Sequence, residues 1–153
     1  MRLTRYTDYT LRVLIFLGLR GEQVSTIREI AQHYGISENH LMKVVHRLGQ
    51  RGLIQTLRGR KGGLLLAVPA ERINIGEVVR WSEEDLVVVE CFDMVTNTCP
   101  IAGPCLLQHV LNQALHAFFA VLDRYTLADL LKNGRVLAQR LGLTLPEVPE
   151  SRA

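Results

Sequence analysis

The three cysteines of this chain, Cys91, Cys99 and Cys105, fall within fifteen of its 153 residues. Their odd number argues against the disulfide framework of a secreted domain. Thiolates bind zinc, copper(I) and iron–sulfur clusters, so one shared metal centre is the main hypothesis. Gaps of seven and five residues fit neither the usual zinc-site spacings nor a ferredoxin run. Three thiolates leave one ligand position open in a four-coordinate site, and His109 is a candidate for it. The alternative to a shared metal centre is that the three thiols have no common role.

A turn-rich loop carries the cysteines, and a long apolar helix follows it. Residues 90–104 are rich in Asp, Asn, Pro and Gly, and the helix is expected from Cys105 to about Tyr125. One apolar seam has steps of four and three residues: Leu107, Leu111, Ala114, Phe118, Val121 and Tyr125. A second apolar side consists of Leu106, Val110, Leu115, Phe119 and Leu122. Two such sides predict packing on the chain's own domain and on a second subunit, which makes a homodimer.

Composition indicates a globular protein with a localised basic region. Apolar residues make up 48% and charged residues 22%, which excludes disordered and collagen-like chains. Residues 1–63 hold eleven Lys and Arg against four acids, a charge of +7, and the remainder carries −4. Such a basic region is typical of a protein that binds a polyanion. No signal peptide or membrane-length apolar stretch is found, so a cytoplasmic location without membrane association is expected.

Residues 1–63 have the pattern of a helix-turn-helix. A first helix is expected from a cap at Thr7 to about Arg20, with Leu11, Leu14 and Ile15 on its buried face. Thr26 and Glu29 form a capping-box signal for the second helix. Ser37 caps a third helix over residues 38–50, whose inward positions are Leu41, Val44, Val45 and Leu48.

A hairpin is predicted next. Two short apolar runs, residues 53–54 and 64–66, flank the basic, glycine-rich stretch 58–63. Directly after a helix-turn-helix, this hairpin is typical of a DNA-binding wing. The expected fold is therefore mainly α: a winged helix-turn-helix with a small β-hairpin wing, a cysteine loop and a long dimerisation helix. The predicted DNA-binding residues are Ser37, Asn39, His40 and Lys43 on the third helix, and Arg47, Arg58, Arg60 and Lys61 for phosphates or a minor groove.

An enzyme is the main alternative of a different class. No Ser/His/Asp arrangement and no pair of carboxylates stands out in the sequence, so a non-enzyme is predicted. A regulator with a structural zinc ion would also use three thiolates and is the second alternative.

The order of these features resembles the bacterial iron–sulfur winged-helix transcriptional regulators. The similarity begins at residues 1–9 (MRLTRYTDY), continues through residues 36–45 (ISENHLMKVV) and 58–63 (RGRKGG), and extends to the three cysteines. The opening with Asp8 is similar to the nitric-oxide-sensing branch, NsrR, rather than to the related IscR branch. The resemblance implies a DNA-binding domain over residues 1–80, a cluster-binding region over 81–104, dimerisation and C-terminal helices over 105–145, and a flexible tail over 146–153.

The NsrR resemblance also implies a ligand set. It assigns a 4Fe–4S cluster to Cys91, Cys99, Cys105 and Asp8 of the partner subunit. The IscR resemblance implies a 2Fe–2S cluster with a His three residues after the third Cys, a position that Gln108 occupies here, next to His109. By the NsrR resemblance, the cluster-bound homodimer represses from pseudo-palindromic double-stranded operator DNA, and nitric oxide releases it. Arg12, four residues after Asp8, is a possible switch partner for Asp8 once iron is lost.

Overall fold

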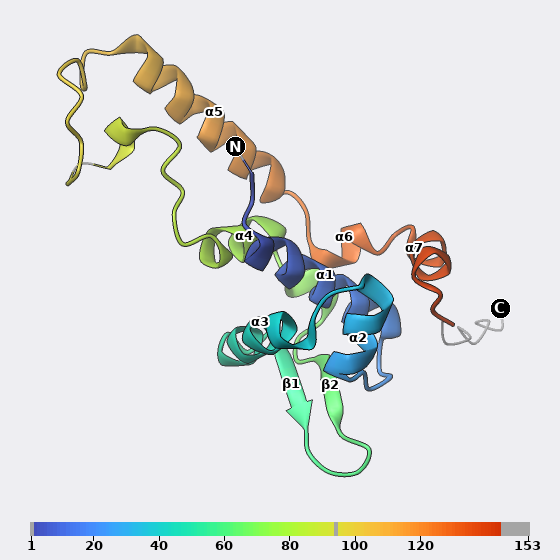
Figure 1. Ribbon diagram of the computed structural model, residues 1–153. Helices are drawn as coiled ribbons and strands as arrows, with labels where there is room; N and C mark the ends of the chain where they lie inside the picture. Colours follow the sequence, from blue (N-terminus) through green and yellow to red (C-terminus); the bar gives the residue numbers. More distant parts are fainter. Residues whose placement is uncertain (1, 94, 145–153) are drawn as a thin grey trace.

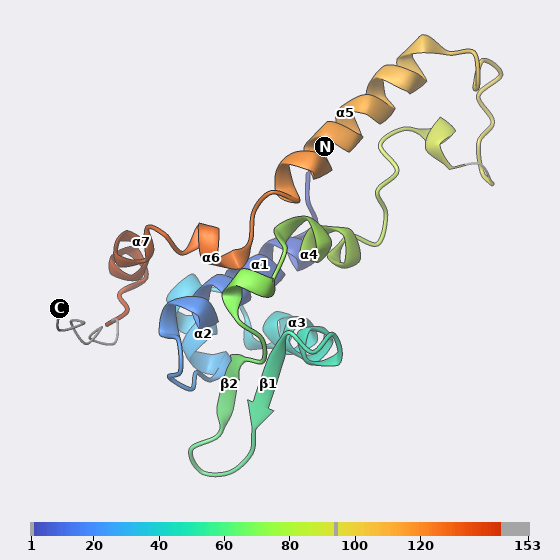
Figure 2. The same cartoon turned by 180° about the vertical axis from the view of Figure 1, so that it is seen from behind.

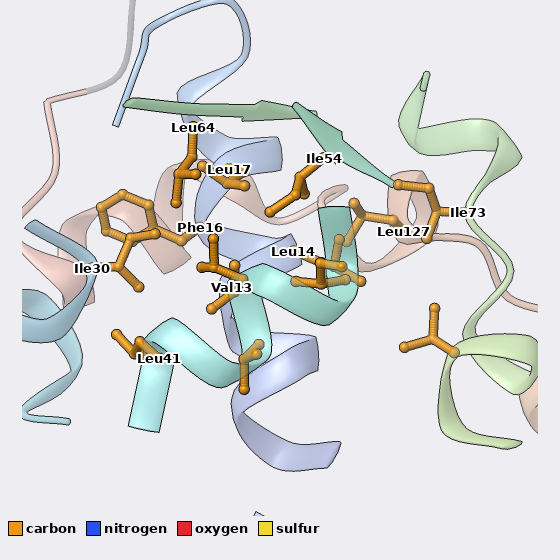
Figure 3. Close-up of a cluster of buried hydrophobic side chains, with 14 of the residues drawn as sticks. Val13, Leu14, Phe16, Leu17, Ile30, Leu41, Ile54, Leu64, Ile73 and Leu127 are labelled. Carbon is orange, nitrogen blue, oxygen red and sulfur yellow. The ribbon is translucent and has the colours of Figure 1, made fainter. Parts of the chain in front are cut away.

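Helix α1 (Arg5–Arg20) lies in the middle of the helical body of the protein (Figure 1). The computed structural model describes residues 2–93 and 95–144. Helices α3, α4 and α6 and strand β2 all contact α1. A helix enclosed on several sides must be apolar around much of its circumference. Its core residues Val13, Leu14, Phe16 and Leu17 are at most 1% exposed, and they meet side chains from the neighbouring elements in Figure 3.

The other elements follow in a simple order. In chain order they are α2 (Ile27–Tyr34), α3 (Glu38–Gln50), β1 (Ile54–Leu57), β2 (Gly63–Leu66), the 3-10 turn η1 (Ala70–Arg72), α4 (Ile75–Ser82), the 3-10 turn η2 (Glu90–Phe92), α5 (Leu106–Leu122), α6 (Leu127–Leu130) and α7 (Gly134–Leu141). This arrangement of helices with one small antiparallel sheet confirms the predicted mainly α winged-helix fold. Of the helices that the structure describes, none is both long and apolar enough to cross a membrane.

Local caps decide where the DNA-domain helices begin. The side chain of Thr26 accepts the Glu29 N–H and the Glu29 carboxylate accepts the Thr26 N–H, which confirms the predicted capping box of α2. The predicted cap of α1 at Thr7 is wrong. Thr4 is the cap, its hydroxyl accepts the Thr7 N–H at 3.2 Å, and Thr7 is buried. The apolar periodicity starts later than the helix does, so it placed the start one turn too late.

The buried side of α1 also differs from the predicted face. Leu11 and Ile15 are only partly buried, whereas Val13 and Phe16 belong to the core. Because α1 is enclosed by several elements, tertiary contacts rather than one apolar stripe decide which of its residues are buried. The predicted inward positions of α3 (Leu41, Val44, Val45 and Leu48) are confirmed as buried.

The predicted hairpin is present. Strands β1 and β2 are antiparallel, with Ile54 opposite Leu66 and Leu57 opposite Gly63. Ser25 adds an isolated bridge to Leu64, which is 3% exposed, so strand β2 is fixed to the loop before α2. The hairpin loop projects away from the helices (Figure 1).

Helix α5 extends from the body, and the cysteine loop lies at its outer end (Figures 1 and 2). Only Phe119, near the end of α5 that joins the body, is fully buried. Leu106, Leu107 and Val110 at the outer end are 75%, 63% and 50% exposed. The predicted second side of the helix therefore packs on the body at Phe119, while its outer half leaves an apolar surface open to solvent.

A bidentate ion pair joins α4 to the end of α5. The two terminal nitrogens of Arg80 lie 2.6 and 2.7 Å from the Asp123 carboxylate oxygens, and the guanidinium lies 4.5 Å from the Phe119 ring centroid. Hydrogen bonding from Arg80 lowers the pKa of Asp123. Asn74 donates its side-chain N–H to the Asp123 carbonyl at 2.7 Å. Planar two-point contacts fix orientation as well as distance, so this joint, together with buried Phe119, anchors the inner end of α5 to the body.

The chain after α5 contains two short helices. The last short helix predicted from Thr126 and Asp129 is confirmed as α6, with a capping box. Helix α7 was not predicted separately. The predicted flexible tail, residues 146–153, lies outside the described residues.

Replacing Gly76 with alanine is expected to destabilise the protein. A Cβ atom at Gly76 would collide with Oδ1 of Asp123 and displace the partner of Arg80. We expect Gly76→Ala to lower the free energy of unfolding by about 1–3 kcal/mol, measured by urea denaturation of the metal-free protein. The matched control is Gly49→Ala in α3, where the added methyl meets open space. Gly49→Ala should raise the free energy of unfolding by up to about 1 kcal/mol. If Gly76→Ala raised it equally, the predicted collision with Asp123 would be wrong.

Candidate metal centre and nucleic-acid interface

The outer face of α3 carries the predicted base-reading residues. Ser37, Asn39, His40 and Lys43 are all exposed. Ser37 caps the helix by accepting the His40 N–H, and its oxygen lies 2.9 Å from Nδ1 of His40. In the described part of the chain, Asn39 and Lys43 have no side-chain hydrogen bond or ion pair. Their polar ends are therefore available to a ligand, whereas His40 is tied to the cap.

Arg47 is held against the protein body. Its side chain is 38% exposed, and the guanidinium lies 5.7 Å from the Tyr6 ring centroid and 3.9 Å from the Glu84 carboxylate. Exposed pairs of this kind contribute little to stability, so a phosphate can compete with Glu84. Its predicted contact with phosphate stays a prediction, and the structure adds a packing role that the sequence did not reveal.

The wing presents three cations at its tip. Arg58, Arg60 and Lys61 are exposed, and no ion pair engages them in the described residues. Gly59 between them has a φ of 107°, a conformation that other residues rarely adopt, which explains a glycine there. Together with the outer face of α3, the wing forms a basic surface of the type that meets DNA phosphates.

The cysteine loop is braced by its own side chains. All three cysteines are free thiols of intermediate burial. The Glu90 carboxylate accepts hydrogen bonds from the N–H and O–H of Thr98, and these bonds lower the pKa of Glu90. The side-chain oxygen of Asn97 accepts the Cys99 N–H at 3.0 Å. Asp93 accepts from the Val95 N–H and from the hydroxyl of Thr96, the larger cause of its lowered pKa. These carboxylates thus stabilise the loop rather than add ligands to the thiols.

The donor set of the loop fits a thiolate-bound metal centre in its chemistry. Cys91, Cys99 and Cys105 are soft donors on a single loop, and none is consumed in a disulfide. In the described ranges, no three or more His, Cys, Asp or Glu residues are grouped closely enough to hold a metal. A tetrahedral position at these thiols therefore needs both a closer approach of the loop and a fourth ligand.

Asp8, the predicted fourth ligand, lies far from the cysteines of its own chain. It is in the first turn of α1 in the helical body, while the cysteine loop is at the outer end of α5 (Figures 1 and 2). Its carboxylate is bound by Arg12, with 3.0 Å from Nε to Oδ1 and 2.8 Å from a terminal nitrogen to Oδ2. The predicted Asp8–Arg12 contact is thus present, and one chain alone does not bring Asp8 to the thiols.

Gln108 is the residue whose contribution the sequence did not reveal. Its side-chain N–H donates to the Cys91 carbonyl at 2.8 Å, and its side-chain oxygen accepts the Gly103 N–H at 2.9 Å. The neighbouring His109 is exposed. The only signal in the sequence was a polar residue on the first turn of the helix after the loop, which does not by itself name its partners.

Comparison with known proteins identifies the family. A model of the Rrf2 family, described as an iron-dependent transcriptional regulator, matches residues 3–133. The chain belongs to the Rrf2 family. This places the winged helix-turn-helix and its basic face in a DNA-binding transcriptional regulator, as predicted.

The relatives within the Rrf2 family agree with the predicted resemblance. The HTH-type transcriptional regulator NsrR of Bacillus subtilis (strain 168) is 59% identical over 134 residues, covering 87% of this chain and 92% of the relative. The protein of the same name from Oceanobacillus iheyensis is 54% identical over 144 residues, covering 94% and 98%.

Solved Rrf2-like structures share the fold. The oxidized form of Staphylococcus aureus CymR superposes with a TM-score of 0.70 at 28% identity, covering 86% of this chain and 97% of that one. T. potens IscR gives 0.69 at 27% identity, covering 87% and 88%.

Neutralising Arg60 should weaken DNA binding without changing sequence preference. A wing cation that meets a phosphate contributes equally on every sequence and releases about one counterion. We expect Arg60→Gln to lower affinity for both a selected operator and random DNA, and to reduce the slope of log affinity against log salt by about one. The operator is first selected from a random pool. Arg135→Gln on α7 is the charge-matched control; loss on the operator alone would contradict the phosphate role.

Changing Asn39 should instead alter sequence preference. An amide side chain on the exposed start of α3 can pair with a base edge, and such a pair discriminates by about 1–3 kcal/mol. We expect Asn39→Ala to relax the preference at one base pair of each half-site while binding to random DNA stays unchanged. Gln50→Ala, at the other end of α3, is the control. Equal loss on operator and random DNA would contradict a reading role.

Proposed function

We propose that this protein is a homodimeric repressor that senses nitric oxide through a 4Fe–4S cluster. Its ligands are Cys91, Cys99 and Cys105 of one subunit and Asp8 of the partner subunit. The observation that carries the proposal is the set of three free thiols on one loop in a chain 50–59% identical to six relatives named NsrR. In the proposal the loaded dimer binds pseudo-palindromic operator DNA in the cytoplasm, and nitric oxide releases the DNA.

A second subunit accounts for two features of the single chain. The outer half of α5 leaves large apolar side chains such as Leu107 and Val110 exposed, which a dimer interface would cover. A partner subunit would also supply the carboxylate that the loop lacks. We therefore assign residues 1–80 to DNA binding, 81–104 to the metal centre and 105–145 to dimerisation and the C-terminal helices.

Asp8 has two alternative partners in this proposal. When bound, the cluster supplies the iron that reacts with nitric oxide, and a carboxylate binds such iron more weakly than a thiolate. Ligation requires Asp8 to leave Arg12, and release allows the ion pair to form again. Arg12 would thus stabilise the released state, in which the two recognition helices no longer keep the spacing of the half-sites.

The presence of Gln108 at its position supports a 4Fe–4S cluster over the 2Fe–2S alternative. At the position of the nitrogen ligand implied by the IscR resemblance, this chain has an amide whose oxygen and N–H are both engaged by loop backbone. A zinc-bound structural regulator remains an outcome of the test below.

The test is an anaerobic preparation assayed for colour, iron and DNA binding. We expect a brown protein with broad absorption at about 400 nm, which binds the selected operator and releases it after nitric oxide is added. A colourless zinc protein, or a brown protein whose DNA binding is indifferent to nitric oxide, would contradict the proposal.

Two variants separate the ligand role of Asp8 from its ion pair. Asp8→Ala and Arg12→Ala both remove a half-exposed i,i+4 pair worth about 0.3–0.5 kcal/mol, and Arg12→Ala also removes the contacts of Arg12 with Tyr9 and Tyr34. We expect Asp8→Ala alone to lose the 4Fe–4S spectrum and the response to nitric oxide, whereas Arg12→Ala keeps the spectrum. An Asp8→Ala protein that retained both would refute the ligand assignment.

A further inference from the structure

The side chain of Gln108 connects the cysteine loop to α5. Its amide group contacts the backbone at two places twelve residues apart, the Cys91 carbonyl and the Gly103 N–H. Among the hydrogen bonds of the described residues, these two are the ones that join residues 86–104 to α5. The Gln108 side chain and its bond to the Cys91 carbonyl are partly buried, whereas the bond from the Gly103 N–H is exposed.

Part of the loop is separated from α5 by an open hollow. A cavity of about 410 Å³ lies between the loop and α5, lined by Leu86, Val87, Cys91, Phe92, Gln108 and Asn112. The bonds of Glu90 and Asn97 end within the loop itself and do not reach the helix. Gln108 therefore supplies the side-chain hydrogen bonds that join the loop to α5.

The two contacts lie close in sequence to the first and third cysteines. One is at Cys91 itself, and the other is two residues before Cys105, the N-cap of α5. A single planar amide that holds both points limits the separation of the first and third cysteines. Cys99 lies between them and is held separately, through its N–H, by Asn97.

We infer that Gln108 is a positioning residue of the metal centre. It holds the backbone beside Cys91 and Cys105 in register on α5, and a displacement of the loop acts on the dimerisation helix through it. The inference rests on the proposed function only in naming these thiols as ligands, because the bonds are present in the metal-free chain.

The test uses reduced, metal-free protein and follows each thiol separately. We expect Gln108→Ala to raise the rate at which iodoacetamide alkylates Cys91 by roughly five-fold, the factor for losing about one net hydrogen bond, with Cys99 unchanged. Peptide mass spectrometry reads the rates, and Gln113→Ala on the exposed face of α5 is the matched control. Equal acceleration of Cys91 and Cys99, or no change at Cys91, would overturn the inference.

Hydrogen exchange provides a second readout at Gly103. The Gly103 amide should lose protection in Gln108→Ala but keep it in Gln108→Glu, because a carboxylate still accepts that N–H while it cannot donate to Cys91. Loss of protection in both variants would contradict the assignment of the Gly103 N–H to the side-chain oxygen of Gln108. If the wild-type protein assembles no cluster, the proposed function fails, while the metal-free measurements still decide the role of Gln108.

Discussion

The burial of α1 is the constraint on which the rest of the structure depends. Four of its large side chains, Val13, Leu14, Phe16 and Leu17, are removed from solvent, and each such burial contributes about 1.5–3 kcal/mol. Helix α3, strand β2, α4 and α6 all use this one helix as their packing surface. The recognition helix, the wing and the first turn that carries Asp8 are therefore held in one rigid arrangement.

The cysteines are connected to this body through two joints in series. Gln108 joins the loop to the outer end of α5, and the Arg80–Asp123 pair joins the inner end of α5 to α4. Helix α5, with its seventeen residues, spans about 25 Å. A rod of this length turns a small change of angle at one joint into a larger displacement at the other end. The two polar joints, together with the packing of Phe119 on the body, thus connect the loop to the DNA-binding domain.

How much of this could be predicted depends on the range of the interactions. The caps at Thr26 and Ser37 are contacts over three residues, so the sequence displays both partners and predicted α2 and α3 correctly. The start of α1 was predicted wrongly because Thr4 and Thr7 both suit a cap, and only the packing of the finished body, in which Thr7 is buried, selects Thr4. Gln108 binds backbone groups, which no sequence pattern names. Asp8 lies more than eighty residues before Cys91, so only family resemblance could link the two.

The contacts of Arg12 bear on how firmly Asp8 is held in the metal-free chain. Besides Asp8, the guanidinium lies 5.9 Å from the Tyr9 ring centroid and 5.7 Å from that of Tyr34. Burial raises the pKa of Tyr34 to about 12, so its hydroxyl stays neutral and offers no competing negative charge. A half-exposed ion pair and an exposed cation–π contact are each worth about 0.3–1 kcal/mol. Arg12 would therefore lose little if Asp8 left, and in the proposed dimer even a modest carboxylate–iron bond would outweigh the ion pair. The same small difference would let the pair form again once that bond was broken.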